Sequence, residues 1–106
     1  MGDFQIHEHD VLVIGAGGAG LRAAIEAAAV DGCSVGIVCK SLLGKAHTVM
    51  AEGGVAAALA NVDERDGWRT HFADTMRGGQ YLNNPRMAEL HAKEAPTRVH
   101  ELEEWG

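Results

Sequence analysis

A chain of 106 residues with 46% hydrophobic residues is long enough for one small globular domain. Its formal net charge of −6, with no cluster of lysine or arginine, argues against a nucleic-acid-binding surface, because phosphate neutralisation requires clustered cations. No apolar run approaches the roughly 20 residues needed to span a bilayer, and Cys33 and Cys39 have the spacing of neither a zinc site nor a redox C-x-x-C motif.

Residues 1–9 are expected to form a loose lead-in. This segment carries acids and histidines and no apolar core, so it is neither a signal peptide nor a transit peptide. The His7-Glu8-His9 triplet could chelate a metal, but no third ligand lies nearby in the sequence. We therefore interpret the segment as a solvated tail and predict no metal site.

A glycine-rich segment between an apolar run and an alanine-rich run organises the first half of the chain. Residues 10–14 are typical of a strand buried on both faces, and residues 18–30 carry apolar side chains at helical spacing. The segment between them follows the G-x-G-x-x-G pattern of dinucleotide binding, in which a diphosphate lies on the N–H groups at the start of the helix. The predicted binding residues are Gly15, Ala16, Gly17, Gly18, Ala19 and Gly20.

Residues 34–39 are predicted to form a second strand after a helix stop at Asp31-Gly32. This strand would run parallel to the first and complete a right-handed βαβ unit. A nicotinamide-binding domain usually places an acid on the adenosine ribose at the end of this strand, whereas this chain has Cys39 and Lys40. The missing acid weighs against an NAD-dependent dehydrogenase.

Residues 41–54 form a long loop at the carboxyl end of the second strand, where α/β folds hold ligands. A lone loop histidine is usually only solvated. His47 stands out because a Gly53-Gly54 pair follows it, whose backbone could lie against a flat or anionic ligand.

The second half of the chain reads mainly as helices. Residues 55–60 are apolar and suit a short strand or a buried extended segment, and a helix ended by Gly78-Gly79 should place Trp68, Phe72, Thr75 and Met76 on one face. His71 is interpreted as a structural residue inside that helix. Asn84-Pro85 is expected to open the next helix, with Met87, Leu90 and His91 as its packed stripe. Pro96 should begin a further helical turn with Val99, Leu102 and Trp105 inward, and Glu101, Glu103 and Glu104 are expected on a solvated face.

Several short segments together resemble a known family. Lys40, the His47-Thr48-Val49 triplet seven residues later and the Ala51-Glu52-Gly53-Gly54 segment are similar to the flavoprotein subunit of succinate dehydrogenase and fumarate reductase. The resemblance runs from His9 to the end of the chain with consistent spacing. It continues through His71-Phe72, Asp74-Thr75, Gly78, Leu82, Ala95-Pro96, Glu101-Leu102-Glu103 and Trp105-Gly106.

The resemblance implies an α/β fold with an FAD-binding, Rossmann-like βαβ start and following helices. Such folds normally contain at least twice the strands predicted here, so we expect an incomplete domain. Residues 10–106 would then be the N-terminal part of an FAD-binding domain, truncated before a capping domain.

The resemblance also implies that His47 carries FAD covalently, through the 8α carbon of the isoalloxazine ring. A neutral imidazole nitrogen is nucleophilic and would add to the electrophilic 8-methyl position. The related L-aspartate oxidases resemble this chain too, but they lack the histidine and hold FAD non-covalently. Beside the glycine segment, the implied cofactor-binding residues are Cys39, Lys40, Ser41, Lys45, Ala46, His47, Thr48, Ala51, Glu52, Gly53 and Gly54.

Four of these positions depart from, or subdivide, the family pattern. Family members often have Ser at the position of Cys39 and Arg-Ser at Lys45-Ala46, and lysine lacks the planar fork of arginine. Glu52 matches the fumarate-reductase type and is the single catalytic candidate, since the main catalytic residues are expected beyond Gly106.

The implied function is oxidation of succinate to fumarate, or the reverse, with FAD as the cofactor. Electrons would pass first to an iron–sulfur subunit, then to quinone. The membrane anchor of the complex, a further subunit, would hold it at the cytoplasmic face of a bacterial inner membrane. The 106-residue chain alone is expected to be inactive. The alternatives are an L-aspartate-oxidase-like enzyme, another FAD- or NAD-dependent dehydrogenase, and a non-catalytic nucleotide-binding fragment.

Overall fold

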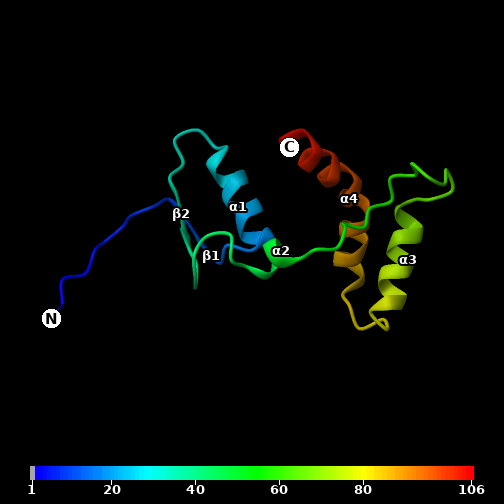
Figure 1. Ribbon diagram of the computed structural model, residues 1–106, viewed down its shortest axis with the longest axis horizontal. Helices are drawn as coiled ribbons and strands as arrows, with labels where there is room; N and C mark the ends of the chain where they lie inside the picture. Colours follow the sequence, from blue (N-terminus) through cyan, green and yellow to red (C-terminus); the bar gives the residue numbers. More distant parts are fainter. Residues whose placement is uncertain (1) are drawn as a thin grey trace. The chain divides into compact units, whose positions relative to one another are not determined.

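The computed structural model describes residues 2–106 and divides the chain into two compact units, Met1–Glu52 and Gly53–Gly106. Within the described residues, the first unit contains two parallel strands and two helices, and the second contains two helices (Figure 1). The chain is therefore a partial α/β fold. None of the helices among residues 2–106 is long and apolar enough to cross a membrane.

The first unit is built on a strand–helix–strand arrangement. Strand β1 (Val11–Ile14) pairs in parallel with β2 (Val35–Val38), in a register that runs from Val11 opposite Val35 to Ile14 opposite Val38. Helix α1 (Gly18–Ala28) connects the two strands and contacts both (Figure 1). The predicted parallel βαβ unit is confirmed.

Helix α1 ends two residues before the predicted Val30. Gly32 has a φ of +74°, a conformation that favours glycine, in the later turn that the Cys33 N–H closes on the Val30 carbonyl at 3.1 Å. The helical pattern of the apolar residues continues past the point where the backbone leaves the helix.

The prediction that β1 is buried on both faces is wrong for this chain. Leu12 is 56% exposed and Ile14 is 82% exposed. The reason is that β1 has one strand partner, and α1 is the helix that contacts the pair. The apolar run predicts a strand correctly, but its burial requires packing partners on both faces.

The lead-in is tied to the sheet at its last residue. His9 Nδ1 and Ser34 Oγ are hydrogen-bonded at 2.9 Å, and the backbone N–H of Ser34 donates to Asp10 Oδ2 at 2.8 Å. The His9 ring also lies against Gly36, where a Cβ would come within 2.5 Å of the ring. His9 is thus packed on the start of the sheet, whereas residues 2–8 have no regular structure.

The second unit is a pair of packed helices, α3 (Trp68–Gly78) and α4 (Pro85–Trp105), which lie side by side (Figure 1). Met76 of α3 is buried, and the three residues predicted on the same face, Trp68, Phe72 and Thr75, are half-buried. Lys93 Nζ of α4 lies 4.5 Å from the centre of the Trp68 ring, a cation–π contact between the two helices. The predicted helix end at Gly78-Gly79 is confirmed, since Gly79 is the C-cap.

Helix α4 begins as predicted but is buried through other residues. The Asn84 side chain caps it by accepting a hydrogen bond from the Met87 N–H at 3.2 Å, and Pro85 is in the first turn. The predicted packed stripe is wrong, because Met87 and Leu90 are 59% and 47% exposed and His91 is also exposed. The buried positions of α4 are Ala88, Ala92 and Ala95, whose small side chains allow a close approach of the helices.

The further helical turn expected to begin at Pro96 is a continuation of α4. Helix α4 continues through Pro96 for 21 residues in total. Leu102 and Trp105, expected inward, are 54% and 55% exposed, while Val99 is half-buried. Proline prevents one backbone hydrogen bond, but the residues on either side keep helical geometry.

Residues 55–60 are neither a strand nor a buried extended segment. Val55 is 71% exposed, and residues 57–60 are half-buried without regular structure. Although these residues are apolar, no strand among the described residues 53–106 is available to pair with them.

Candidate functional site

The glycine segment forms a tight turn between β1 and α1. Gly15 has a φ of +109°, a conformation that side chains rarely adopt, and its N–H donates to the Val38 carbonyl at 2.8 Å. A Cβ at Gly20 would overlap the carbonyl oxygen of Gly15 and lie 3.4 Å from Val13 Cγ1. The turn therefore requires glycine at its first position for conformation and at its last for close packing.

The start of α1 presents backbone donors rather than side chains. Gly17 is the N-cap residue, in an extended conformation and without a side-chain cap. The first N–H groups of any α-helix lack acceptors within the helix, and the helix dipole makes this end partially positive. An anionic group would therefore be favoured here.

A second segment reaches this helix end from 30 residues away. The backbone N–H of Gly18 donates to Thr48 Oγ1 at 3.0 Å. A Cβ at Gly17 would lie 3.7 Å from Thr48 Oγ1 and 3.9 Å from the Ala46 Cβ, so these residues border the turn. Thr48 belongs to α2 (His47–Met50), a single helical turn. His47, one residue earlier, is exposed.

The residues after β2 lie at the same sheet edge as the glycine turn. Because β1 and β2 are parallel, the segments that follow Ile14 and Val38 leave from one edge. Cys39 Sγ donates to the Ser41 carbonyl at 2.8 Å, which folds the chain back just after the strand. Lys40 is exposed between them. Farther along, the Lys45 N–H donates to the Leu42 carbonyl at 3.2 Å and closes the turn before α2.

The last group of predicted residues, at positions 51–54, makes few contacts. Ala51 follows α2, and its N–H is 3.4 Å from the Thr48 carbonyl. Glu52 is exposed, and Gly53 and Gly54 open the second unit with free space where a Cβ would stand. The first unit thus brings together the glycine turn, residues 39–41 and residues 45–48.

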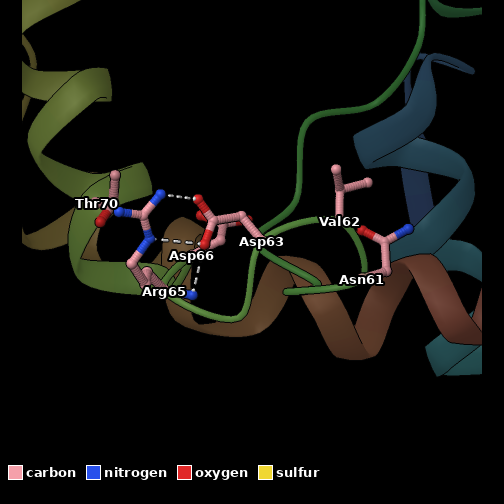
Figure 2. A pocket seen from close by; sticks show the side chains of 6 residues that line it. All are labelled: Asn61, Val62, Asp63, Arg65, Asp66 and Thr70. Atoms are coloured by element: carbon pink, nitrogen blue, oxygen red, sulfur yellow. Dashed lines mark hydrogen bonds and ion pairs between the residues drawn. The ribbon is translucent and has the colours of Figure 1, made fainter.

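The second unit contains a pocket of about 460 Å³ between the loop after residue 60 and the start of α3 (Figure 2). Arg65 Nη2 and Nε lie 2.7 and 3.0 Å from the Asp63 carboxylate oxygens, which also accept from the Arg65 N–H. The Arg65 side chain, and to a lesser degree its N–H, holds the pKa of Asp63 below its usual range. Asp63 and Arg65 thus form an exposed ion pair beside the pocket. The residues that line the pocket are Asn61, Val62, Asp63, Arg65, Asp66 and Thr70.

A histidine pair lies between the two helices of the second unit. The rings of His71 and His91 are 5.5 Å apart in an edge-to-face arrangement, and His71 Nδ1 is buried without a hydrogen-bond partner among residues 2–106. The 20-residue spacing could not reveal this pairing, because it depends on how α3 and α4 pack. Packing between helices agrees with the structural interpretation of His71.

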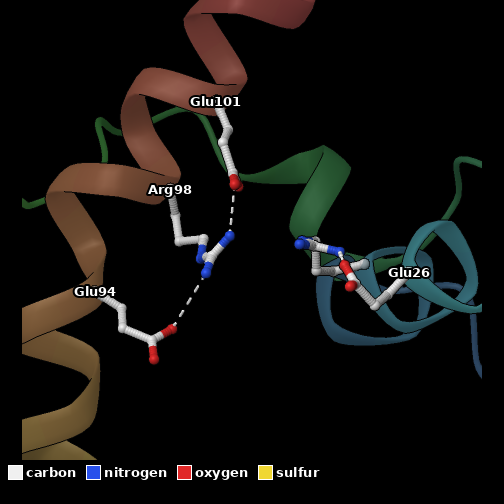
Figure 3. A network of polar contacts seen from close by, with 5 residues as sticks. Glu26, Glu94, Arg98 and Glu101 are labelled. Atoms are coloured by element: carbon white, nitrogen blue, oxygen red, sulfur yellow. Dashed lines mark hydrogen bonds and ion pairs between the residues drawn. The ribbon is translucent and has the colours of Figure 1, made fainter. Parts of the chain in front are cut away.

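Several acidic residues of α4 lie beside basic side chains of the same helix. Figure 3 shows Arg98 between Glu94 and Glu101, at 3.7 and 2.6 Å respectively. His100 Nδ1 lies 3.6 Å from Glu103 Oε2. Glu103 and Glu104 are exposed, as predicted, whereas Glu101 is half-buried beside Arg98. Among residues 2–106, no three His, Cys, Asp or Glu side chains are placed to hold a metal ion.

The geometry of the first unit suits a dinucleotide cofactor. The N-cap Gly17 has no side chain of its own, and the nearby residues supply one hydroxyl and several N–H groups rather than carboxylates. Such a donor set fits a diphosphate. The exposed His47 adds a nucleophilic side chain beside that site.

Comparison with known proteins identifies the cofactor class and closely similar chains. A fumarate reductase (CoM/CoB) subunit of Methanothermobacter marburgensis is 50% identical over 103 residues, which are 96% of this chain and 19% of that protein. The succinate dehydrogenase flavoprotein subunit of Coxiella burnetii is 41% identical over 107 residues, 100% of this chain and 18% of that protein. The chain thus spans about a fifth of the length of these curated relatives.

A solved structure shares the fold. Mycobacterium smegmatis Sdh1 in complex with UQ1 matches with a TM-score of 0.86 and 68% sequence identity, over 94% of this chain and 16% of that one. The resemblance to the flavoprotein subunits of succinate dehydrogenase and fumarate reductase is therefore confirmed. The model of the FAD binding domain family matches residues 10–106. The chain belongs to the FAD binding domain family.

Proposed function

We propose that the native full-length protein is the flavoprotein subunit of a succinate dehydrogenase or fumarate reductase, which interconverts succinate and fumarate. Relatives with these names are 41–50% identical over nearly the whole chain. The observation that carries the proposal is the hydrogen bond between Gly18 and Thr48, which brings the His47 segment to the glycine turn. The L-aspartate oxidases, as described above, lack that histidine.

The Rossmann-like start of the fold would hold the FAD diphosphate. Residues 15–20 supply backbone N–H groups at the positive end of α1, and Thr48 can donate its hydroxyl proton while its oxygen accepts from Gly18. Gly17 is the residue at which the backbone can approach the diphosphate most closely. FAD, when bound, would supply hydride transfer to or from the dicarboxylate.

His47 would attach FAD covalently through the 8α carbon. Its side chain is exposed on a turn that Thr48 anchors to the start of α1. The other proposed cofactor contacts lie after β2 and around α2. They are Cys39, Lys40, Ser41, Lys45, Ala46, Ala51, Glu52, Gly53 and Gly54, and Glu52 is the proposed catalytic candidate of this chain.

The proposed partners follow from the same family relationship. An iron–sulfur subunit would accept the electrons, quinone would receive them, and a membrane anchor subunit would hold the complex peripherally at the cytoplasmic face of a bacterial inner membrane. Support comes from the similarity to flavoprotein subunits and to Sdh1, whose structure is a complex with UQ1. Co-purification of the tagged native protein from membranes, followed by iron analysis and mass spectrometry, tests this assembly.

The decisive experiment asks whether flavin stays attached after denaturation. We expect the native full-length protein to keep its yellow fluorescence through acid precipitation and denaturing electrophoresis, and mass spectrometry should place the flavin on the peptide with His47. Complete release of FAD by acid would contradict the covalent site and favour an L-aspartate-oxidase-like enzyme. Absence of FAD from the purified protein would contradict the whole proposal.

A further inference from the structure

Helix α1 is capped by a residue that is distant in the sequence. Its N-cap, Gly17, has no side chain to accept a hydrogen bond, so the N–H of Gly18 would be left without an acceptor inside the helix. Thr48 Oγ1 accepts from that N–H at 3.0 Å across 30 residues of sequence. Thr48 therefore performs for α1 the function that a serine or threonine at the N-cap usually performs.

The same contact anchors α2. A helix of four residues is too short to be stable alone, because nucleating a turn costs more than its few hydrogen bonds return. Within α2 and its caps, Val49 N–H bonds to the Ala46 carbonyl and Ala51 N–H approaches the Thr48 carbonyl. The Thr48 methyl group also packs closely on Gly18, where an added Cβ would lie 3.1 Å from Thr48 Cγ2. Thr48 thus contacts the start of α1 through both its hydroxyl and its methyl group.

We propose that Thr48 is a positioning residue that sets His47 relative to the glycine turn during covalent attachment of FAD. This inference rests on the proposed function. His47 directly precedes Thr48 in α2. If Thr48 shifts relative to the start of α1, the His47 imidazole therefore shifts with it. Bond formation is steeply sensitive to such displacements, because reacting atoms must be held near attack distance.

The rate of covalent bond formation between His47 and FAD is the quantity to be measured. The bond that forms joins an imidazole nitrogen of His47 to the 8α carbon, that carbon loses one hydrogen as a proton, and the imidazole loses its N–H proton. Two electrons stay on the flavin, and the quinone or fumarate of the proposed reaction accepts them. Non-covalent binding of FAD precedes this step and does not require it. The amount of bound FAD and the amount of covalently attached FAD can therefore be measured separately.

The experiment compares three variants of the native full-length protein. Thr48→Val removes the hydroxyl at nearly constant shape, Thr48→Ser keeps the hydroxyl and removes the methyl, and Thr75→Val is the matched control. Thr75 is suitable because its hydroxyl donates to the His71 carbonyl within its own helix, at 2.8 Å. Total flavin after gel filtration and acid-stable flavin after precipitation are measured on the same samples over time.

With FAD supplied at a concentration that saturates non-covalent binding, we expect Thr48→Val to attach FAD roughly three to ten times more slowly, as the loss of one hydrogen bond predicts. Thr48→Ser, which keeps the hydroxyl, should attach FAD faster than Thr48→Val, and Thr75→Val should attach it at the parental rate. An unchanged rate in Thr48→Val would overturn the proposal, and so would a parallel fall of total and covalent flavin, which would make Thr48 only a binding residue. A parent protein without acid-stable flavin would instead contradict the proposed function.

Discussion

Replacing Gly20 with alanine should destabilise the protein, although alanine is the better helix former. The added methyl would overlap the carbonyl oxygen of Gly15 and lie 3.4 Å from Val13 Cγ1. The overlapped atom is backbone, so no side-chain rotation can relieve the clash and the turn or the helix must shift. Gly78 provides the matched control, because it lies in the last turn of α3 with nothing within 4 Å of an added Cβ.

The expected magnitudes follow from these two environments. Overpacking costs about 1–3 kcal/mol, and exchanging glycine for alanine in a helix returns at most about 1 kcal/mol. Since the clash at Gly20 involves backbone, we expect Gly20→Ala to lower the free energy of unfolding by about 2 kcal/mol. Gly78→Ala should raise it by about 0.5 kcal/mol, because only the helix-propensity gain applies there.

Guanidinium unfolding followed by circular dichroism measures this difference. The native full-length variants are compared at equal flavin content, so that a change in cofactor loading does not shift the midpoint. A midpoint for Gly20→Ala equal to or above that of Gly78→Ala would refute the close packing of α1 on the glycine turn.

Three further changes test the site and the second unit. Gly17→Ala should keep the fold, because its Cβ would make only ordinary contacts at 3.7 and 3.9 Å. In a cofactor titration it should weaken FAD binding roughly tenfold or more, and an unchanged affinity would contradict the proposed position of the diphosphate. His47→Ser should keep non-covalent FAD and lose succinate oxidation more than fumarate reduction, because the proposed imidazole substituent would raise the flavin reduction potential. Equal losses in assays of both directions would contradict this effect on the potential. Asn84→Ala should cost about 1 kcal/mol in chemical unfolding, since it removes the cap of α4, and a change below roughly 0.3 kcal/mol would contradict that role.

The elements defined by local signals could be predicted from the sequence. Signals from neighbouring residues define the strand before Gly15, the start of the helix after it and the second strand. The structure contains all three, and the two strands pair in parallel as expected. The cap at Asn84 likewise depends on a dipeptide signal. Such features need little information about the rest of the fold.

Burial could not be predicted in the same way. The expected stripe of α4 assumed that large apolar side chains mark the packed face, but Ala88, Ala92 and Ala95 form it and Met87 is exposed. Helices that approach closely use small residues, and composition alone does not reveal the distance between two helices. The exposure of Leu12 has a related cause, because it depends on which elements cover the sheet.

The sequence predicts which segments form the candidate site better than it predicts how those segments contact each other. The glycine pattern and the His-Thr-Val triplet point to the two segments, and the structure brings them together through Gly18 and Thr48. No spacing rule predicts a contact across 30 residues, since it depends on the path of the loop after β2. The role of each residue toward FAD is what the flavin-attachment and titration experiments measure.

Pro96 has a consequence for the local opening of α4. Without an N–H, it cannot donate to the Ala92 carbonyl, so the hydrogen-bond ladder of α4 is interrupted there. All three buried alanines precede Pro96, whereas residues 97–105 include no buried side chain. Amide hydrogen exchange over minutes to hours should therefore be slow before Pro96 and faster after it, so that one continuous helix opens as two separate cooperative segments.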